Sequence, residues 1–499
     1  MVFYTHLVNK IYMENITKKY ISYNNRKNYL TNNYLKNIFI NNKIKKHNNN
    51  YIEKERIKLS SNLTEEQKNA VVIDEDNTLV ISSAGCGKTF TIVSKIDYLI
   101  NEKNINEKEI LCISFTNKSV EDLKQKIKYN VDIFTFHKLS IEILKDYNFQ
   151  INICEGDYLE YIVNEVLYNY NLNNRLIIDF INYFILFEKE ETKVFKKKNK
   201  MLLLIFYLYK IYISEKESSN LLDFNDLIKK SNDYINKYGL KRYYKYIIID
   251  EYQDISNDKY KLINSIKNVC NSHLFCVGDD YQSIYNFSGS DLDLILKFKK
   301  MFGYTKVLFL TKTFRCPYEL TELSTRFILK NKKQIRKKVI SDRRIKKPVK
   351  IIYYDKNIII KFKKIVLIFD KVLILIRNKN DIYLLKDKDI IINDNYIIFN
   401  NKRIEYMTVH KSKGLEEDNI IIINLENKIN GFPSLIKRDK LLNLVYKEKN
   451  KMEEERRLFY VALTRSKNYV FLFVDKNNPS IFIKEILKES KNNIEVLDL

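Results

Sequence analysis

The sequence predicts an α/β protein in which two parallel-sheet domains follow one another and the first carries a helical insertion. From Leu63 onward, short apolar runs alternate with amphipathic stretches of helix length. Several of these runs end in a polar turn, which is typical of buried parallel strands whose carboxyl ends form a ligand site. One run leads into two closely spaced glycines, in a chain that has only 9 glycines among its 499 residues.

The predicted domains follow the distribution of these runs. Residues 1–62 form an Asn-rich, basic extension with a single acid, Glu14, in its first fifty positions, and both a transit segment and a disordered tail fit this composition. The first domain, residues 63–297, holds the runs "TLVISSA", "ILCISF", "YKYIIIDE" and "HLFCVGD". Long amphipathic or apolar segments interrupt it at about 141–222 and predict helices. The second domain, residues 298–499, holds "KVLFLTKTFR", "KVLILIRN", "IEYMTVHKSKG", "NIIIINL" and "NYVFLFV".

The composition restricts the partners and the compartment. Lys and Arg number 87 against 62 Asp and Glu, and the formal net charge of +25 favours a polyanionic partner, most simply nucleic acid, although a Lys-rich solvated surface is the alternative. The six cysteines show neither a CxxC pair nor zinc-ligand spacing, which predicts a reducing, intracellular compartment and no structural metal. No apolar run approaches the roughly 18 residues of a membrane span, so we expect a soluble protein without a membrane partner.

The glycine pair belongs to a predicted phosphate-binding loop. A strand, the loop "SSAGCGKT" and a helix follow one another, and a Cβ at either glycine would obstruct the approach of backbone N–H groups to phosphate oxygens. The lysine would neutralise the β- and γ-phosphates and the threonine hydroxyl would bind Mg²⁺, whereas a simple helix-capping turn is the alternative. The predicted nucleotide-binding residues of the loop are Ser83, Ala84, Gly85, Cys86, Gly87, Lys88 and Thr89.

A second buried strand ends in two acids within "YIIIDEYQD". Asp250 is suited to hold Mg²⁺ through a bound water, and Glu251 is suited to be the general base that aligns an attacking water. Two acids after a strand are usually solvated turn residues, but a phosphate loop upstream favours the catalytic interpretation. The predicted metal site therefore consists of Thr89 and Asp250.

With these residues, the chain resembles the UvrD/Rep/PcrA-type DNA helicases of superfamily 1A over most of residues 63–475. The resemblance implies two RecA-like motor domains, ATP and Mg²⁺ as cofactors, and single-stranded and duplex DNA as partners. The segments that carry it for the nucleotide are "LTEEQKNAV", "VGDDYQSIYNFSGS", "TKTFRCPYEL" and "EEERRLFYVALTRSKNYVFLF". They imply that Gln67 binds the adenine edge and that Gln282 couples phosphate state to DNA. Arg315 would meet the γ-phosphate, and Arg465 would be the arginine finger. The segment of residues 407–425 implies that Glu416 contacts the ribose.

Further segments resemble the DNA-contacting motifs of the same family. They are "ISFTNKSVEDLKQKI", "TFHKLS", the end of "VGDDYQSIYNFSGS" and "MTVHKSKGLEEDNIIIINL". Aromatic faces suit a protein that grips single strands regardless of sequence, although such side chains are more often core residues. The DNA-binding residues implied by the resemblance are Phe115, Thr116, Asn117, Thr135, His137, Tyr285, Phe287, His410 and Lys413.

The chain departs from the family pattern in several places. Phe90 and Ser288 stand where the family often has basic residues. Only the interval Lys379–Glu405 separates "VLILIRN" from the fifth motif, so the accessory 2B domain of the family is predicted to be absent or reduced to a hairpin. The basic run Lys330–Lys350 predicts either added contacts to the DNA backbone or a solvated helix face.

The predicted function is that of an ATP-dependent DNA helicase, and its 3′ to 5′ polarity is implied by the resemblance alone. A single-stranded DNA translocase that displaces proteins without unwinding is the alternative, given the short interval at the 2B position. A non-enzymatic DNA-binding relative is disfavoured because every catalytic position is filled. The loading partner is left open.

Overall fold

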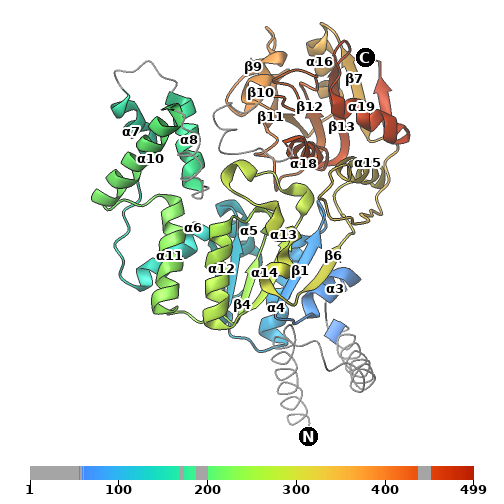
Figure 1. Ribbon diagram of the computed structural model, residues 1–499. Helices are drawn as coiled ribbons and strands as arrows, with labels where there is room; N and C mark the ends of the chain where they lie inside the picture. Colours follow the sequence, from blue (N-terminus) through green and yellow to red (C-terminus); the bar gives the residue numbers. More distant parts are fainter. Residues whose placement is uncertain are drawn as a thin grey trace, which may run out of the picture. The chain divides into compact units, whose positions relative to one another are not determined.

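The computed structural model describes residues 55–56, 59, 61–154, 156–167, 174–186, 200–436 and 451–498. The chain divides after Asn62, and the unit Leu63–Leu499 holds both sheets (Figure 1). The predicted N-terminal extension lies almost entirely outside the described residues.

The first sheet has six strands, all parallel, in the order β3-β2-β4-β5-β1-β6. Alternate residues of its central strand β4 enter two different cores: Ile247 and Ile249 pack on one face, Tyr246 and Ile248 on the other. Both faces are therefore covered, which explains why the strands are continuous apolar runs in the sequence. The strands are β1 Asn77–Ser82, β2 Ile110–Ser114, β3 Asp132–Thr135, β4 Tyr246–Ile249, β5 His273–Gly278 and β6 Lys306–Leu310.

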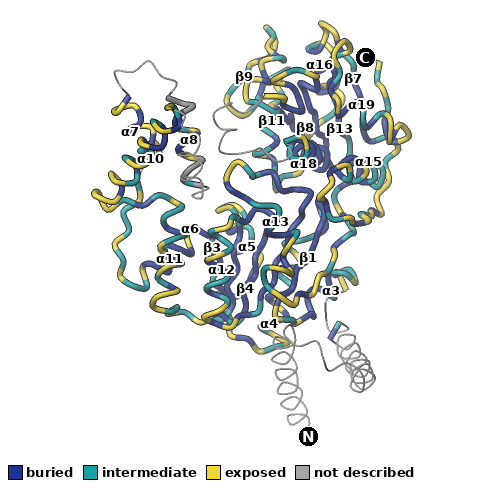
Figure 2. The backbone as a smooth tube through the Cα atoms, in the orientation of Figure 1, coloured by how far each residue is buried: buried dark blue, intermediate teal, exposed yellow. Residues whose placement is uncertain are grey.

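Helices cover the two faces of this sheet. Apolar residues of α6, α11 and α12 fill one core and those of α4 and α5 fill the other. The strands β1 and β4 between these layers are buried along their length (Figure 2). Polar side chains cap several of these helices; Asp223, for example, accepts from two N–H groups of α11 and completes a capping box. The helices of this unit up to residue 302 are α3 Glu65–Val72, α4 Lys88–Asn101, α5 Asn117–Lys126, α6 Phe136–Asp146, α7 Tyr158–Val166, α8 Asn174–Leu186, α10 Lys200–Ser218, α11 Phe224–Tyr238, α12 Asn257–Cys270, α13 Leu292–Leu296 and α14 Phe298–Phe302.

The predicted insertion is helical in its described part. Helices α7, α8 and α10 share a core of their own, to which Ile162, Phe180 and Ile205 contribute. The predicted start at about residue 141 is wrong, because α6 continues to Asp146 and its Ile143 packs in the core of the first sheet. The apolar periodicity of α6 does not by itself assign it to the insertion or to the sheet, and its packing places it on the first sheet.

The second sheet has eight strands in the order β14-β7-β13-β12-β8-β11-β10-β9. Six of them pair in parallel, whereas β9 and β10 pair antiparallel at one edge. Its strands are β7 Val349–Tyr354, β8 Val372–Ile376, β9 Ile391–Ile392, β10 Tyr396–Phe399, β11 Lys402–Thr408, β12 Glu417–Ile422, β13 Ser466–Asp475 and β14 Ile494–Leu497. Its helices are α15 Tyr318–Ile328, α16 Ile358–Ile368, α18 Lys451–Leu463 and α19 Ile481–Glu489.

The interval predicted to lack an accessory domain contains only local structure. A 3₁₀ helix spans Lys379–Leu385, and strands β9 and β10 then extend the second sheet beside β11. Buried Ile397 and Ile404 join the core of this sheet. The parallel first sheet, the second sheet with its antiparallel edge strands β9 and β10, the helical insertion and the minimal 2B region thus agree with the predicted fold class.

One predicted boundary is wrong. The run "KVLFLTKTFR" was predicted to start the second domain after residue 297, but β6 pairs with β1 of the first sheet, with Leu79 opposite Val307 and Ser82 opposite Leu310. The short helices α13 and α14 return the chain to that sheet, since buried Phe298 packs in its core. Most of β6 is accessible, as suits an edge strand, and no sequence pattern assigns an edge strand to one of two similar sheets.

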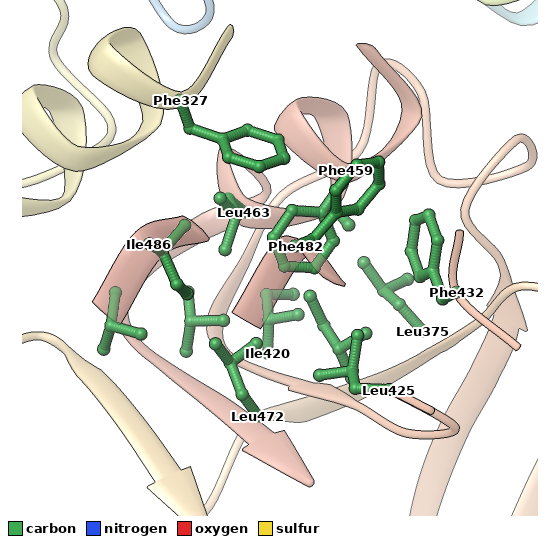
Figure 3. Packing of buried hydrophobic residues seen from close by; sticks show 14 of the residues in the cluster. Phe327, Leu375, Ile420, Leu425, Phe432, Phe459, Leu463, Leu472, Phe482 and Ile486 are labelled. Carbon is green, nitrogen blue, oxygen red and sulfur yellow. The ribbon is translucent and has the colours of Figure 1, made fainter. Parts of the chain in front are cut away.

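The core on one face of the second sheet is rich in aromatic rings (Figure 3). The ring of Phe459 lies 5.2 Å from those of Phe327 and Phe432 and 5.5 Å from that of Phe482, measured between centroids. These rings come from three helices and a loop, so Phe459 of α18 joins α15 and α19 to the sheet. Such edge-to-face and tilted contacts add to the burial of apolar area.

Two further properties concern the described residues as a whole. None of their helices has the length and apolar character needed to cross a membrane. All six cysteines are described and all are free thiols.

Replacing Phe459 by Ala is expected to lower the free energy of unfolding by about 3–5 kcal/mol, because it leaves a cavity among three other rings. Urea denaturation followed by circular dichroism measures this change. Ile368→Ala, at a side chain that is 68% exposed on α16, is the control and should change stability by less than about 0.5 kcal/mol. A similar loss in the two variants would contradict the assigned core.

Candidate nucleotide and DNA site

The loop between β1 and α4 has the backbone that a phosphate-binding loop requires. Gly85 has φ +72° and Gly87 has φ +77°, a region that other residues rarely adopt. A Cβ on Gly85 would lie 2.5 Å from Cβ of Arg315 and 2.8 Å from Oγ1 of Thr313. The glycine is therefore needed because a second chain segment passes directly against the loop.

That segment and helix α3 hold the loop from two sides. The Thr313 hydroxyl donates to the carbonyl of Ala84 at 2.8 Å, and the N–H of Phe314 donates to the carbonyl of Gly85 at 2.9 Å. From α3, Gln67 Nε2 donates to the carbonyl of Cys86 at 3.2 Å. The Gln67 side chain thus supports the loop itself, and its contact with an adenine edge stays a prediction.

The loop leaves polar groups at the start of α4. Ser83 Oγ is buried without a hydrogen-bond partner, although the Ser83 carbonyl accepts from the N–H of Cys86. Thr89 lies in the first turn of α4 and is half-buried. A helix N-terminus favours anions, so an anion at this loop would meet both backbone N–H groups and the helix dipole. The residues present therefore fit the phosphates of a nucleotide.

Lys88 faces the acids at the end of β4. Its Nζ lies 2.5 Å from Glu251 Oε1, and although burial opposes its charge, Glu251 and Asp250 raise the pKa of Lys88. Burial also raises the pKa of Glu251, but Lys88 and Lys413 outweigh it and lower that pKa to about 2. Burial and the charge of Glu251 raise the pKa of Asp250 to about 6. The pKa values of the two neighbouring acids are therefore shifted in opposite directions.

The environment of Glu251 is fixed by its backbone and by Gln253. Glu251 has φ +52°, the left-handed region, so the chain turns sharply as β4 ends. The Gln253 amide donates to Glu251 Oε2, and its Oε1 accepts from the N–H of Asp279 at 2.8 Å. The end of β4 is thereby joined to the end of β5.

The two predicted arginines reach this edge from the second lobe and from the segment after β6. Arg465 is 1% exposed and donates to the carbonyls of Val461 and Leu415 and to Gln282 Oε1, at 3.0–3.2 Å. It forms no salt bridge with any described residue. Burial, with the neighbouring Arg315, lowers the pKa of Arg465 to about 9. A buried guanidinium without a counter-charge is well suited to meet an anion.

Arg315 is paired already. Its Nε donates to Glu416 Oε2 at 2.7 Å and its Nη1 donates to the carbonyl of Thr464 at 3.2 Å. Lys467 also lies 3.1 Å from Glu416. Glu416 therefore orients Arg315 beside the phosphate loop, and its predicted contact with a ribose stays a prediction.

Lys413 differs from the sequence-based expectation. It was predicted to face DNA, but its side chain is only 7% exposed, and its ammonium pairs with Asp254 and donates to the carbonyl of Gln282 at 2.7 Å. The physical reason is that Asp254, 1% exposed, requires a counter-charge in the interior. Lys413 thus joins the second lobe to the nucleotide end of the first.

The predicted aromatic residues form a row across the two lobes. The rings of Phe115 and Tyr285 are stacked, with centroids 5.9 Å apart and planes at 8°. The ring of Phe287, which is 57% exposed, has its centroid 6.0 Å from that of the Tyr285 ring and 5.5 Å from that of the His410 ring. The Tyr285 hydroxyl donates to the carbonyl of His410 at 3.1 Å. We call Phe115, Tyr285, Phe287 and His410 the aromatic row.

The remaining predicted DNA residues have structural partners as well. Thr116 and Thr135 cap α5 and α6 by accepting N–H groups at 3.1 and 3.3 Å. Asn117, the first residue of α5, is exposed. The ring of His137 packs on Phe224 at 5.1 Å. Their proposed contacts with DNA stay predictions.

Both predicted histidines are uncharged at neutral pH. Burial, with Lys259 nearby, lowers the pKa of His137 to about 4. Burial, with Arg377 and Lys413, lowers the pKa of His410 to about 4. The predicted contacts of these two side chains with DNA would therefore involve neutral rings.

Two residues of the site were not predicted from the sequence. Phe314 presents a half-exposed ring beside Gly85, and Lys259 Nζ lies 4.1 Å from the ring centroid of Phe115. Gln253, which follows the predicted acids in "YIIIDEYQD", joins the two strand ends. Phe314 was detectable, since it lies next to the predicted Arg315. Lys259 was not, because it stands in an ordinary amphipathic helix and only the fold brings it to Phe115.

The interpretation of the basic run Lys330–Lys350 is wrong at its centre. Between α15 and β7 the chain has no helix, and Lys337 is buried rather than solvated or turned toward DNA. Lys337 lies 2.6 Å from Asp279 and 2.9 Å from Asp280. The buried acids Asp279 and Asp280 require a cationic side chain that can reach them, and the sequence does not reveal which lysine of the run does so.

A phosphate loop on one parallel sheet, acids at the neighbouring strand ends and a buried arginine from a second sheet define a nucleotide-dependent motor of two RecA-like domains. Two family models match the chain: "UvrD/REP helicase N-terminal domain" over residues 63–303 and "UvrD-like helicase C-terminal domain" over residues 384–477. The chain belongs to the UvrD/Rep family of superfamily 1A DNA helicases, a class of ATP-dependent enzymes.

Named relatives agree with this assignment. The chain is 27% identical to DNA helicase IV of Escherichia coli over 502 residues, covering 86% of this chain and 70% of that protein. It is 28% identical to the "Probable DNA helicase" of Mycoplasma pneumoniae, covering 86% and 87% of the two chains. It is 30% identical to the ATP-dependent DNA helicase Rep of Buchnera aphidicola, but there the match covers 57% of this chain and 47% of the relative.

The raised pKa of Asp250 predicts that Mg²⁺ use weakens in acid. Below about pH 6 the carboxyl takes up a proton that competes with the cation, so the Mg²⁺ concentration for half-maximal ATP hydrolysis should rise up to about tenfold per pH unit. The measurement is a Mg²⁺ titration of hydrolysis at several pH values. An unchanged Mg²⁺ requirement from about pH 7 to about pH 5 would refute the role given to Asp250.

Proposed function

We propose that this chain is an ATP-dependent DNA helicase that moves 3′ to 5′ along single-stranded DNA and separates the duplex ahead of it. The observation that carries the proposal is the buried Arg465, which contacts Gln282 of the other lobe and forms no salt bridge within the described residues. An arginine held in this way is suited to stabilise charge on a transferring phosphoryl group. Family membership and the names of the relatives support the same function.

The nucleotide would be held between the lobes. When bound, ATP supplies the phosphoanhydride whose hydrolysis drives the motor, with Mg²⁺ at Thr89 and Asp250 neutralising phosphate charge. The Gly85 and Gly87 backbone would hold the phosphates, and Arg315 and Arg465 would approach from the other side. The half-exposed ring of Phe314, beside Gly85, offers a flat face for the base.

Glu251 is the carboxylate best placed to orient an attacking water. Its pKa of about 2 keeps it ionised at neutral pH, and Gln253 donates to its second oxygen. Lys88 pairs with it here, so a phosphate that draws Lys88 away would free the Glu251 carboxylate to orient water. Lys88 therefore connects binding of the phosphate to release of the Glu251 carboxylate.

The same contacts provide a route from nucleotide to DNA. Gln282 contacts Arg465 through its side chain and Lys413 through its carbonyl, and Tyr285 stands a few residues further along. The Tyr285 hydroxyl joins His410, which lies in the same turn as Lys413. A change in the distance between the lobes would shift the aromatic row, whose rings are suited to stacking with bases at about 1–3 kcal/mol each.

A translocase that displaces proteins without unwinding is the second candidate. It is favoured by the interval between β8 and β11, which holds only a 3₁₀ helix and the strands β9 and β10. Both candidates use the same hydrolytic site, so they differ only in their action on duplex DNA.

Hydrolysis should depend on single-stranded DNA and on Lys88. We expect Lys88→Ala to lower the DNA-stimulated rate of ATP hydrolysis at least about tenfold, because the variant loses the cation that faces the phosphates. Lys364→Ala, an exposed lysine on α16, is the control and should keep the wild-type rate. No hydrolysis by the wild type, or full activity of Lys88→Ala, would contradict the proposal.

Polarity and unwinding are tested together with tailed duplexes. We expect a duplex with a 3′ single-stranded tail to be separated in the presence of ATP and Mg²⁺, and blunt or 5′-tailed duplexes to be separated at least about tenfold more slowly. Displacement of streptavidin from biotinylated single strands, with no duplex separated, would support the translocase instead. Faster separation from a 5′ tail would refute the polarity.

A further inference from the structure

Lys337 is a buried cation at the edge of the first sheet. Its Nζ donates to the carbonyl of Ser82 at 2.6 Å, to Asp279 Oδ1 at 2.6 Å and to Asp280 Oδ1 at 2.9 Å. The side chains of all three charged residues are fully buried. Although burial opposes its charge, the two carboxylates raise the pKa of Lys337. All three N–H bonds of the ammonium are therefore used within the protein.

Asp279 is connected by hydrogen bonds to the residues predicted to meet the γ-phosphate. Asp279 Oδ2 accepts from Gln282 Nε2 at 2.6 Å, and Gln282 Oε1 accepts from Arg465 Nη2 at 3.1 Å. These bonds orient the Gln282 amide, with its nitrogen toward Asp279 and its oxygen toward Arg465. Lys337 is therefore separated from the arginine by two side chains.

The other acid has a different task. Asp280 Oδ2 accepts from the N–H of Ile335 and from Gln334 Nε2, both at 2.8 Å. The Tyr281 hydroxyl donates to the carbonyl of Ile335 at 2.8 Å. Asp280 thus holds the segment that carries Lys337, whereas Asp279 connects that lysine to the site.

The phosphate loop does not depend on Lys337 for its anchoring. Ser82 also donates from its hydroxyl to the carbonyl of Gly278 at 3.1 Å, and it pairs with Leu310 in the sheet. The strand end should keep its place without the lysine. Loss of Lys337 would therefore act on the two carboxylates, because Asp279 and Asp280 would both be buried without their paired cation, and Asp279 is the one that contacts Gln282.

We propose that Lys337 is a positioning residue for the γ-phosphate end of the nucleotide site. It compensates the charge of Asp279, so that Gln282 and Arg465 keep the orientation in which they meet the terminal phosphate. This inference rests on the proposed function, since it requires a nucleoside triphosphate in the cleft. It concerns the terminal phosphate alone, because the contacts of a diphosphate lie at the loop, whose anchors are independent.

The test compares two nucleotides in the full chain. The dissociation constants of ADP and of a non-hydrolysable ATP analogue, both with Mg²⁺, are measured by isothermal titration calorimetry. We expect Lys337→Met to weaken binding of the analogue at least about tenfold while ADP binding changes less than about threefold. Lys338→Met, an exposed neighbour, is the matched control and should leave both constants unchanged.

A second variant guards against misfolding. Lys337→Arg keeps the positive charge but cannot direct one nitrogen at all three acceptors. We expect the dissociation constant of the ATP analogue, divided by that of ADP, to rise at least about threefold. Circular dichroism and thermal melting establish that each variant is folded. Equal weakening of both nucleotides, or an unchanged ratio in a folded variant, would overturn the inference by showing a purely structural role.

The wild-type chain separates this inference from the proposed function. A wild type that binds both nucleotides but does not separate duplexes contradicts the helicase proposal alone, and the ratio measured in the variants still decides the role of Lys337. A wild type that binds neither nucleotide overturns both.

Discussion

A charge removed from water has to be matched by an opposite charge or by hydrogen bonds, and this requirement governs the junction of the two sheets. Lys88 is matched by Glu251, Lys413 by Asp254 and Lys337 by Asp279 and Asp280. Arg465, like Arg457 of α18, forms no salt bridge with any described residue, and neutral oxygen atoms accept the hydrogen bonds of both. Of these two arginines, Arg465 is the one beside Arg315, where an anion is expected to bind.

The same contacts connect the phosphate end of the nucleotide site with the aromatic row. Lys413 and Arg465 come from the second lobe, and both end on Gln282 of the first. The backbone of the same segment leads within three residues to Tyr285, which stacks on Phe115 and bonds to His410. A shift of one lobe relative to the other would therefore be felt at the phosphate end and in the aromatic row at the same time.

The aromatic row contributes little charge of its own. Its histidine is neutral because burial and two neighbouring cations lower its pKa, and its most accessible member is the apolar ring of Phe287. Binding through stacked rings is insensitive to base identity, which suits a motor that has to move over any sequence. In the proposed function, the large positive charge of the chain would supply attraction to the DNA backbone as a general property rather than through these side chains.

The sequence by itself determined the two parallel sheets, the helical insertion and the phosphate loop, because each depends on local patterns: apolar runs, helical periodicity and a pair of glycines before Lys88. It did not determine that β6 completes the first sheet, that Lys413 points inward, or that Lys337 rather than its neighbours is buried. Those outcomes depend on which segments meet in space, since an edge strand, a buried acid and a long cation have no periodic signature. Tertiary structure decided them through the pairing of β6 with β1 and through the need to match buried acids with cations, and both can be evaluated only when the partners are in place.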